Sequence, residues 1–448
     1  MDLKGKKVAV IGVGKTGRAT ARFLADRGAR IALTDEKPIE AWGETLSELK
    51  QQQADLITTP YGPEVLTGAD LVVPSPGVYP SNPILREALQ REIPILSELE
   101  LASRYLSTPL VAITGTNGKT TVTTLLGEIL RTAGKKVFVG GNIGSPLIGY
   151  VNGPQEADWV VVEVSSFQLQ WAGTFHPRIA LLLNITSDHI DYHGSFAAYR
   201  RIKESIFSRQ TASDLAILNA DETSTKLLLG RLSAQIECFS STAVVDCGIS
   251  LAGEKLVHVS PAGRREEYPL GMIRLPGRHN IENVMASIVA ARGCGCTPPE
   301  IIRAVEGFRG IAHRIEYAGE KNGVLYYDDS KGTNVGAVIR ALESFSQPVV
   351  LLLGGRDKEG DFETLVPLIR ERVRELILFG EAGEKINARI GGVVKTQRTA
   401  TMKDAVATAG RLASPGDVVL LSPGCASFDE FTDYKDRGRV FKELVRTL

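Results

Sequence analysis

Residues 110–121 of the chain are LVAITGTNGKTT, an apolar run that leads into a turn with two glycines. The apolar residues predict a buried strand, and helical spacing follows over residues 120–133. In a phosphate-binding loop of this order, backbone N–H groups cradle the phosphates, Lys119 neutralises their charge and Thr120 offers a hydroxyl to Mg²⁺. Ile113 stands where the usual P-loop pattern has its first glycine. Strand, turn and helix still fall where the mechanism needs them, so we predict a nucleoside triphosphate site.

Short β-branched runs alternate with longer helical patterns on both sides of this loop. Such alternation is typical of βαβ units and parallel sheets, so we predict an α/β chain. At ~150 residues per domain, 448 residues correspond to about three domains. We expect a Rossmann-like N-terminal domain, a central domain with the parallel sheet of a P-loop ATPase and a Rossmann-like C-terminal domain. Their expected extents are residues 1–97, 98–309 and 310–448.

A second glycine motif, GVGKTG, occupies residues 12–17 between a predicted strand and a predicted helix. Glycines allow the backbone to approach a pyrophosphate at a helix N-terminus, where N–H groups favour anions. Asp35 follows at the end of the next strand. The motif predicts a diphosphate-nucleotide site, but it does not identify the nucleotide, and NAD stays open.

Two further strands of the central domain end in polar residues. Residues 159–162 run into Glu163, and residues 179–183 run into a loop that carries His189. The carboxyl ends of parallel strands share one edge of a sheet, where ligands bind. We therefore expect Glu163 to ligate a Mg²⁺ held by Thr120 and the ATP phosphates, and His189 to ligate a second metal or orient a substrate. Lys203, on a following helix, by itself indicates only a solvated surface lysine.

Three polar loops follow strands of the C-terminal domain, at residues 328–334, 354–358 and 422–428. Each loop alone is ordinary, but together at one sheet edge they predict a pocket for an anionic ligand.

Composition limits the classes of partner. The 52 basic residues balance 52 acidic ones, and zero net charge argues against nucleic-acid binding. No apolar run approaches the ~20 residues of a membrane span, and the N-terminus lacks the pattern of a signal peptide. The five scattered cysteines show neither a disulfide framework nor zinc spacing. We expect a cytoplasmic monomer with small-molecule partners.

Several segments together closely resemble the Mur ligase family: GTNGKTT at residues 115–121, PGRHN at 276–280, HR at 313–314 and DSK at 329–331. The runs at residues 163–169 and 422–428 are similar to those of the members that add D-glutamate. The resemblance extends over essentially the whole chain, in order. It implies ATP- and Mg²⁺-dependent amide formation between UDP-N-acetylmuramoyl-L-alanine and D-glutamate, through an acyl phosphate, in peptidoglycan precursor synthesis. Because water would hydrolyse an acyl phosphate, we also expect the C-terminal domain to close over the site.

The resemblance also implies roles for individual residues. Those at the UDP substrate would be Gly14, Lys15, Thr16, Asp35, Lys37, Ser75, Asn142, Ser165 and Gln168. Those at ATP would be Gly115, Thr116, Asn117, Gly118, Lys119, Thr120, Thr121, Asn280, Arg314 and Asp329. The metal ligands would be Thr120, Glu163, His189 and Lys203, and the catalytic residues Lys119, His189 and Lys203. Lys203 would carry a carbamate, which turns a cation into an anion able to bind Mg²⁺. D-glutamate would lie among Lys331, Thr333, Lys358, Ser427, Phe428 and Tyr434.

Other interpretations stay open from the sequence. An NAD-dependent oxidoreductase would use residues 12–17 and Asp35 but would leave Glu163 and the phosphate loop without a purpose. A non-enzymatic nucleotide switch or scaffold would leave the C-terminal loops unexplained. A sister ligase for another amino acid, or a folylpolyglutamate-type ligase, is nearest, although the folate type would leave the N-terminal glycines idle.

Overall fold

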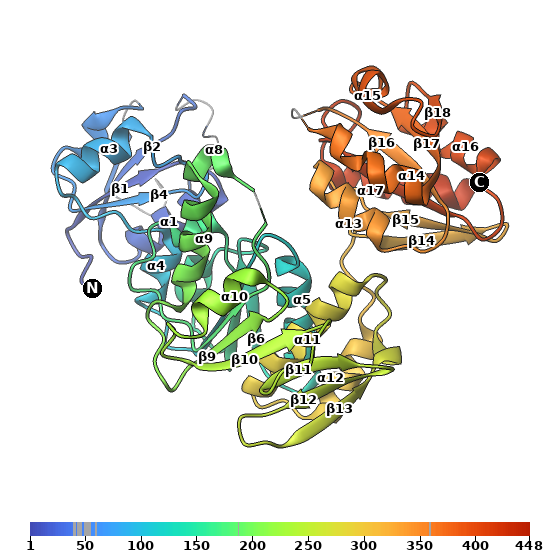
Figure 1. The fold of residues 1–448 in the computed structure, drawn as a ribbon. Coiled ribbons are helices and arrows are strands. Elements are labelled where there is room, and N and C mark those ends of the chain that lie inside the picture. The colour runs from blue at the N-terminus through green and yellow to red at the C-terminus, as the bar shows by residue number, and fades with distance from the viewer. Residues whose placement is uncertain (39–41, 43–46, 49–54, 59–60, 187, 358–359) are drawn as a thin grey trace. The chain divides into compact units, whose positions relative to one another are not determined.

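The computed structural model describes residues 1–38, 42, 47–48, 55–58, 61–186, 188–357 and 360–448. These residues form three separate sheets, each with its own helices, which confirms the predicted α/β class (Figure 1). Two compact units contain them: Met1–Ile273 with Glu282–Phe308, and Arg274–Ile281 with Arg309–Leu448. The domain boundaries at residues 97 and 309 stay predictions.

The N-terminal sheet of unit 1 is parallel, in the order β3-β2-β1-β4. Its strands are β1 (Lys7–Ile11), β2 (Arg30–Thr34), β3 (Asp55–Thr58) and β4 (Leu71–Pro74). The accompanying helices are α1 (Lys15–Ala25), η2 (Pro63–Leu66), α3 (Pro83–Gln90) and α4 (Glu98–Ser103). A Cβ at Gly17 would lie 1.8 Å from the backbone oxygen of Gly12, so the β1–α1 turn requires glycine there.

The second sheet of unit 1 has nine strands, in the order β13-β12-β11-β10-β9-β8-β5-β7-β6. The strands are β5 (Leu110–Thr114), β6 (Val137–Gly141), β7 (Trp159–Glu163), β8 (Ile179–Leu182), β9 (Leu215–Asn219), β10 (Gln235–Ser240), β11 (Gly248–Ala252), β12 (Lys255–Val259) and β13 (Arg265–Pro269). Its helices are α5 (Lys119–Thr132), α6 (Leu147–Val151), α7 (Ser166–Leu169), α8 (Ile190–His193), α9 (Phe196–Glu204), η3 (Ser205–Phe207), α10 (Thr223–Leu228), η4 (Leu270–Met272), α11 (Arg278–Gly293) and α12 (Pro298–Gly307). All pairs are parallel except β11–β12 and β12–β13. Because β5, β7 and β8 are parallel, their carboxyl ends lie at the same edge of the sheet.

The sheet of unit 2 has six strands, in the order β14-β15-β19-β16-β17-β18, with β14 alone antiparallel to its neighbour. The strands are β14 (Glu316–Lys321), β15 (Val324–Asp328), β16 (Val349–Gly354), β17 (Val373–Phe379), β18 (Lys395–Arg398) and β19 (Val418–Gly424). The helices are α13 (Val335–Glu343), η5 (Phe362–Leu365), α14 (Val366–Arg372), α15 (Gly383–Ile390), α16 (Met402–Leu412) and α17 (Tyr434–Thr447). Apolar clusters lie on both faces of this sheet, so its central strands β16, β17 and β19 are almost entirely buried, whereas the edge strands β14 and β18 are partly exposed.

Among the described residues, none of the helices is both long enough and apolar enough to cross a lipid bilayer.

Candidate active site

The phosphate loop joins β5 to α5 through two glycines in conformations that other residues rarely adopt. Gly115 has φ of +153° and Gly118 has φ of +81°. A Cβ at Gly118 would lie 2.3 Å from the Asn283 side-chain oxygen. The Lys119 Nζ donates to the backbone oxygens of Gly115 and Thr116, at 2.8 Å each. The ammonium group therefore lies over the loop, at the anion-favouring end of α5.

Glu163 reaches this loop because β7 pairs with β5, with Glu163 opposite Ile113. The Thr120 hydroxyl donates to Glu163 Oε2 at 2.7 Å, and the Asn142 Nδ2 donates to Oε1 at 2.8 Å. The Glu163 side chain is held at both oxygens, and the residue is only 3% exposed. Thr120 after β5 and Asn142 after β6 thus both contact the carboxylate of Glu163 at the end of β7, as the shared sheet edge predicts.

Lys203 is the clearest correction to the sequence analysis of single residues. It is 2% exposed rather than solvated, because α9 places it beneath the phosphate loop. Its Nζ donates to the Gly115 backbone oxygen at 2.8 Å and lies 4.8 Å from the Tyr199 ring centre. Burial first, and then the positive charge of Lys119, lower the pKa of Lys203 well below its ordinary value. Both effects favour the neutral form of this amine over the charged form.

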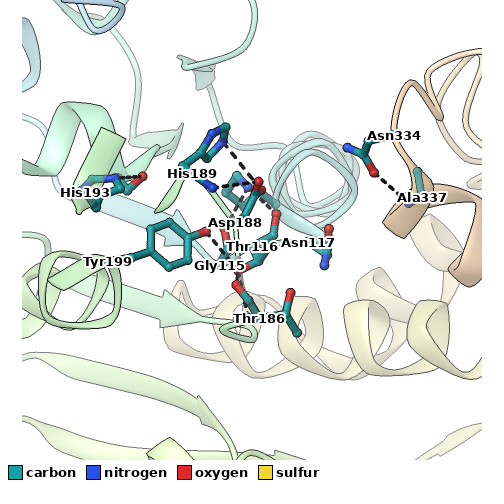
Figure 2. A network of polar contacts seen from close by, with 12 residues as sticks. Gly115, Thr116, Asn117, Thr186, Asp188, His189, His193, Tyr199, Asn334 and Ala337 are labelled. Carbon is teal, nitrogen blue, oxygen red and sulfur yellow. Dashed lines mark hydrogen bonds and ion pairs between the residues drawn. The ribbon is translucent and has the colours of Figure 1, made fainter. Parts of the chain in front are cut away.

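Tyr199 is a residue of this site that the sequence analysis missed. Its hydroxyl lies 3.0 Å from Thr116 Oγ1, and burial raises the pKa of Tyr199 to about 12 (Figure 2). Tyr199 and Lys203 are four positions apart, so they share a face of α9. This four-residue spacing is the feature of the sequence from which Tyr199 could have been predicted to lie beside Lys203. Asn184 was missed as well; its Oδ1 accepts from the Asn117 N–H at 2.8 Å and helps fix the loop.

His189 lies in the loop after β8, with φ of +51°. Its backbone N–H donates to Asp188 Oδ1 at 3.0 Å, and its ring Nε2 is 3.6 Å from Asp188 Oδ2 (Figure 2). Thr186, in the same loop, donates its N–H to Thr116 Oγ1 at 3.0 Å. The loop that carries His189 is thus fastened to the phosphate loop.

Ser165 and Gln168, both predicted at the UDP substrate, form a buried capping box on α7. Gln168 Oε1 accepts from the backbone N–H and the hydroxyl of Ser165, at 3.0 Å each. Ser165 lies two residues after Glu163, so the capped turn begins just beyond the end of β7.

The remaining predicted UDP residues of unit 1 gather where the N-terminal strands end. Gly14 is the N-cap of α1, and Lys15 and Thr16 open that helix. Asp35 accepts from the backbone N–H groups of Val13 at 2.7 Å and Lys37 at 2.9 Å. The Ser75 hydroxyl is 3.4 Å from the Gly12 oxygen, and the Lys15 ammonium donates to the Gly144 oxygen.

The three remaining residues predicted at ATP all belong to unit 2. Asp329 follows β15, is buried and accepts from the Ser422 hydroxyl at 2.7 Å. Burial raises the pKa of Asp329 to about 7, although Ser422 and the charge of Arg314 act in the opposite direction. Asn280 donates its side-chain N–H to the Pro276 oxygen at 2.7 Å.

The described residues among those predicted at D-glutamate lie in two loops and α17 of unit 2. The Lys331 Nζ lies 3.9 Å from the Tyr434 ring centre, a cation–π contact, and the Thr333 N–H donates to the Lys331 oxygen at 2.9 Å. Ser427 is buried, whereas Phe428 is 59% exposed. Lys358 lies outside the described residues.

Arg437 of α17 joins these loops and was missed, because an arginine on an amphipathic helix normally faces water. It is fully buried and donates to the backbone oxygens of Ser330 at 2.9 Å and Cys425 at 3.1 Å. Burial lowers the pKa of Arg437 to about 10, so the group stays charged at neutral pH. The N–H groups of its guanidinium therefore hold the loop after β15 and the loop after β19 together.

Three family models match the chain in sequence order. They are the MurD-like N-terminal domain of Mur ligases at residues 6–97, the Mur ligase middle domain at 113–291 and the Mur ligase glutamate ligase domain at 313–425.

Relatives match over the full length. A UDP-N-acetylmuramoylalanine–D-glutamate ligase of Syntrophus aciditrophicus is 58% identical over 447 residues, which are 100% of this chain and 99% of the relative. The protein of the same name from Geotalea uraniireducens is 45% identical, with the same coverage. Among solved structures, MurF ligase from Thermotoga maritima in complex with ADP has a TM-score of 0.61 at 16% identity, over 93% of this chain and 96% of that one. The last match concerns the fold alone.

Proposed function

This chain belongs to the Mur ligase family, and we propose that it joins D-glutamate to UDP-N-acetylmuramoyl-L-alanine at the expense of ATP. The alanine carboxylate attacks the γ-phosphorus, which yields an acyl phosphate and ADP. The amine of D-glutamate then attacks the acyl carbon, an amide bond forms, and inorganic phosphate and the amine proton leave. Two anions must meet in the first step, so positive charge at the phosphate loop is the central requirement.

The observation that carries this proposal is the meeting of Lys119, Thr120 and Glu163 at the N-terminus of α5. Lys119 and the helix N–H groups supply the positive charge for the triphosphate. The hydroxyl of Thr120 and the carboxylate of Glu163, 2.7 Å apart, are hard oxygen donors of the kind that Mg²⁺ binds. When bound there, Mg²⁺ would neutralise phosphate charge. The choice of D-glutamate rests on the names of the full-length relatives.

Lys203 and His189 complete the proposed machinery. The neutral amine of Lys203 attacks CO₂, an N–C bond forms, and a proton leaves to give a carbamate anion. This anion would serve as a further oxygen ligand for Mg²⁺, beside Glu163. His189 would hold a metal or the alanine end of the substrate from its loop beside Thr116.

The residues at the carboxyl ends of β1, β2 and β4 would hold UDP, and Asn142, Ser165 and Gln168 the muramoyl-alanine end. Asn280, Arg314 and Asp329 would contact ATP, and Lys331, Thr333, Ser427, Phe428 and Tyr434 would surround D-glutamate. The proposal includes the three domains with boundaries at residues 97 and 309, a monomeric state and a cytoplasmic location.

Phosphate release from ATP tests this function with few reagents. Release should require both UDP-N-acetylmuramoyl-L-alanine and D-glutamate, and the product mass should equal the two substrates minus one water. L-glutamate and the amino acids of sister ligases serve as controls. Turnover with another amino acid in preference to D-glutamate would identify a sister ligase. NAD reduction without ATP would instead favour an oxidoreductase.

A further inference from the structure

Four aromatic side chains of unit 1 form a continuous strip, made of Tyr79, Tyr192, Phe167 and His189. Ring centres are 5.0 Å apart between Tyr79 and Tyr192, 4.3 Å between Tyr192 and Phe167, and 4.7 Å between Phe167 and His189. The rings come from the turn after β4, from α8 with its N-cap, and from α7. Segments far apart in the sequence therefore build one aromatic surface.

The strip is fixed at its centre and partly exposed at one end. The Tyr192 hydroxyl donates to the Val78 oxygen at 3.1 Å, which fastens the turn after β4 to α8. Tyr192 is buried, but its neighbour Tyr79 remains 46% exposed. A large aromatic side chain that packs on a buried aromatic ring and is itself nearly half exposed is typical of a ligand platform rather than of core packing.

The two ends of the strip lie beside two parts of the proposed substrate site. Tyr79 is four residues after Ser75, whose hydroxyl faces Gly12 in the glycine motif proposed to hold the diphosphate. His189, at the other end, belongs to the loop that is fastened to Thr116 of the phosphate loop. In the proposed substrate, the amino sugar lies between the diphosphate and the L-alanine that reacts. The strip therefore lies between the proposed positions of the diphosphate and of the L-alanine, which are the two groups that the amino sugar connects.

We propose that the exposed part of the Tyr79 side chain, which packs on Tyr192, is the platform on which the N-acetylmuramoyl ring of the UDP substrate stacks. A pyranose ring presents a face of C–H bonds, which packs against an aromatic ring and is removed from water by it. Tyr79 thereby selects UDP-linked amino sugars over UDP itself. This inference rests on the proposed function and adds a specificity-determining residue to it.

Calorimetric titration without ATP or D-glutamate tests the platform with two probes, UDP-N-acetylmuramoyl-L-alanine and UDP. Tyr79→Ala should weaken binding of the sugar nucleotide about five- to tenfold and leave UDP binding unchanged, because one aromatic contact is lost. Tyr79→Phe keeps the ring and should bind both probes like the wild type. Leu89→Ala, at a 53% exposed apolar residue of α3, is the matched surface control.

The inference is wrong if Tyr79→Ala binds the sugar nucleotide as tightly as the wild type does. Equal weakening of both probes also overturns it, because Tyr79 would then act on the nucleotide or on the fold of the turn. Failure of the proposed function has a different signature: the wild-type protein itself would not prefer the sugar nucleotide to UDP, or would bind it without releasing phosphate from ATP.

Discussion

Replacing Lys203 with methionine should lower turnover at least about 100-fold without destabilising the protein. The substitution removes the ammonium and nearly conserves volume at a position that is 2% exposed. The Gly115 oxygen that accepts from Lys203 also accepts from Lys119 at 2.8 Å, so it keeps a partner. The Thr114 hydroxyl likewise still donates to the Val164 oxygen at 2.9 Å. Such a substitution usually destabilises a protein because a buried acceptor is left without a hydrogen bond. Here both acceptors near Lys203 keep another partner.

The stability effect follows from the pKa of Lys203, which burial lowers well below the ordinary value of 10.5. The unfolded chain then binds this proton more tightly than the folded chain, and the folded state is penalised below pH 10.5. The penalty is about 1.36 kcal/mol per pKa unit, is complete below the folded pKa and disappears above pH 10.5. We therefore expect the methionine variant to unfold at a higher Tm than the wild type at pH 7.5.

Phosphate release and thermal unfolding measure the two effects separately. Turnover should fall at least about 100-fold, the usual scale for losing one preorganised electrostatic group. Unfolding is followed in bicarbonate-free buffer at pH 7.5 and at pH 10, where the gain should shrink. Arg201→Met, at an exposed position of the same helix, is the control and should change neither quantity.

Two results would refute this reasoning. Turnover near the wild-type rate would show that Lys203 has no part in catalysis. A fall in Tm of several degrees would show that the ammonium stabilises the loop rather than straining it. Partial rescue of Lys203→Ala by short carboxylates would further support a carbamate as the active form.

Three other changes have defined outcomes. Glu163→Gln should lower phosphate release about 100-fold while circular dichroism stays unchanged, because it removes the charge that Thr120 contacts; wild-type rates would exclude a metal role. Gly17→Ala should cost about 3 kcal/mol in urea unfolding, since its Cβ would lie 1.8 Å from a backbone oxygen, whereas Gly149→Ala, with open space, should be neutral or stabilising. Burial raises the pKa of Glu98 from 4.5 to about 7, so its stabilising contribution is lost as pH rises through 7. Glu98→Gln should therefore gain up to about 3 kcal/mol relative to the wild type between pH 4.5 and pH 8, and a pH-independent difference would contradict this.

Much of the site could be predicted because it depends on local pattern and one topological rule. An apolar strand followed by glycines and a helix is a short-range signal, and α5 begins at Lys119, one residue from the expected start. Glu163 is the last residue of β7, which pairs in parallel with β5, so the shared edge of the sheet brings it to Thr120. Neither inference needs knowledge of side-chain packing.

Other features depend on which distant segments pack together. The polarity patterns around Lys203 and Arg437 are those of ordinary surface cations, and only the family resemblance singles out Lys203, yet both are buried. The aromatic strip likewise joins Tyr79 to Tyr192, which are more than a hundred residues apart. The burial of a side chain depends on all the residues that pack around it, and these residues come together only in the folded chain.

The sequence by itself determined the α/β class, the two glycine loops and the carboxylate beside the second of them, because hydrophobic periodicity and turn chemistry are properties of neighbouring residues. Only the tertiary structure decided that Lys203 lies beneath the phosphate loop and that Arg437 ties two loops together. Burial and the resulting changes in pKa arise from contacts between remote segments, and these exist only in the folded chain.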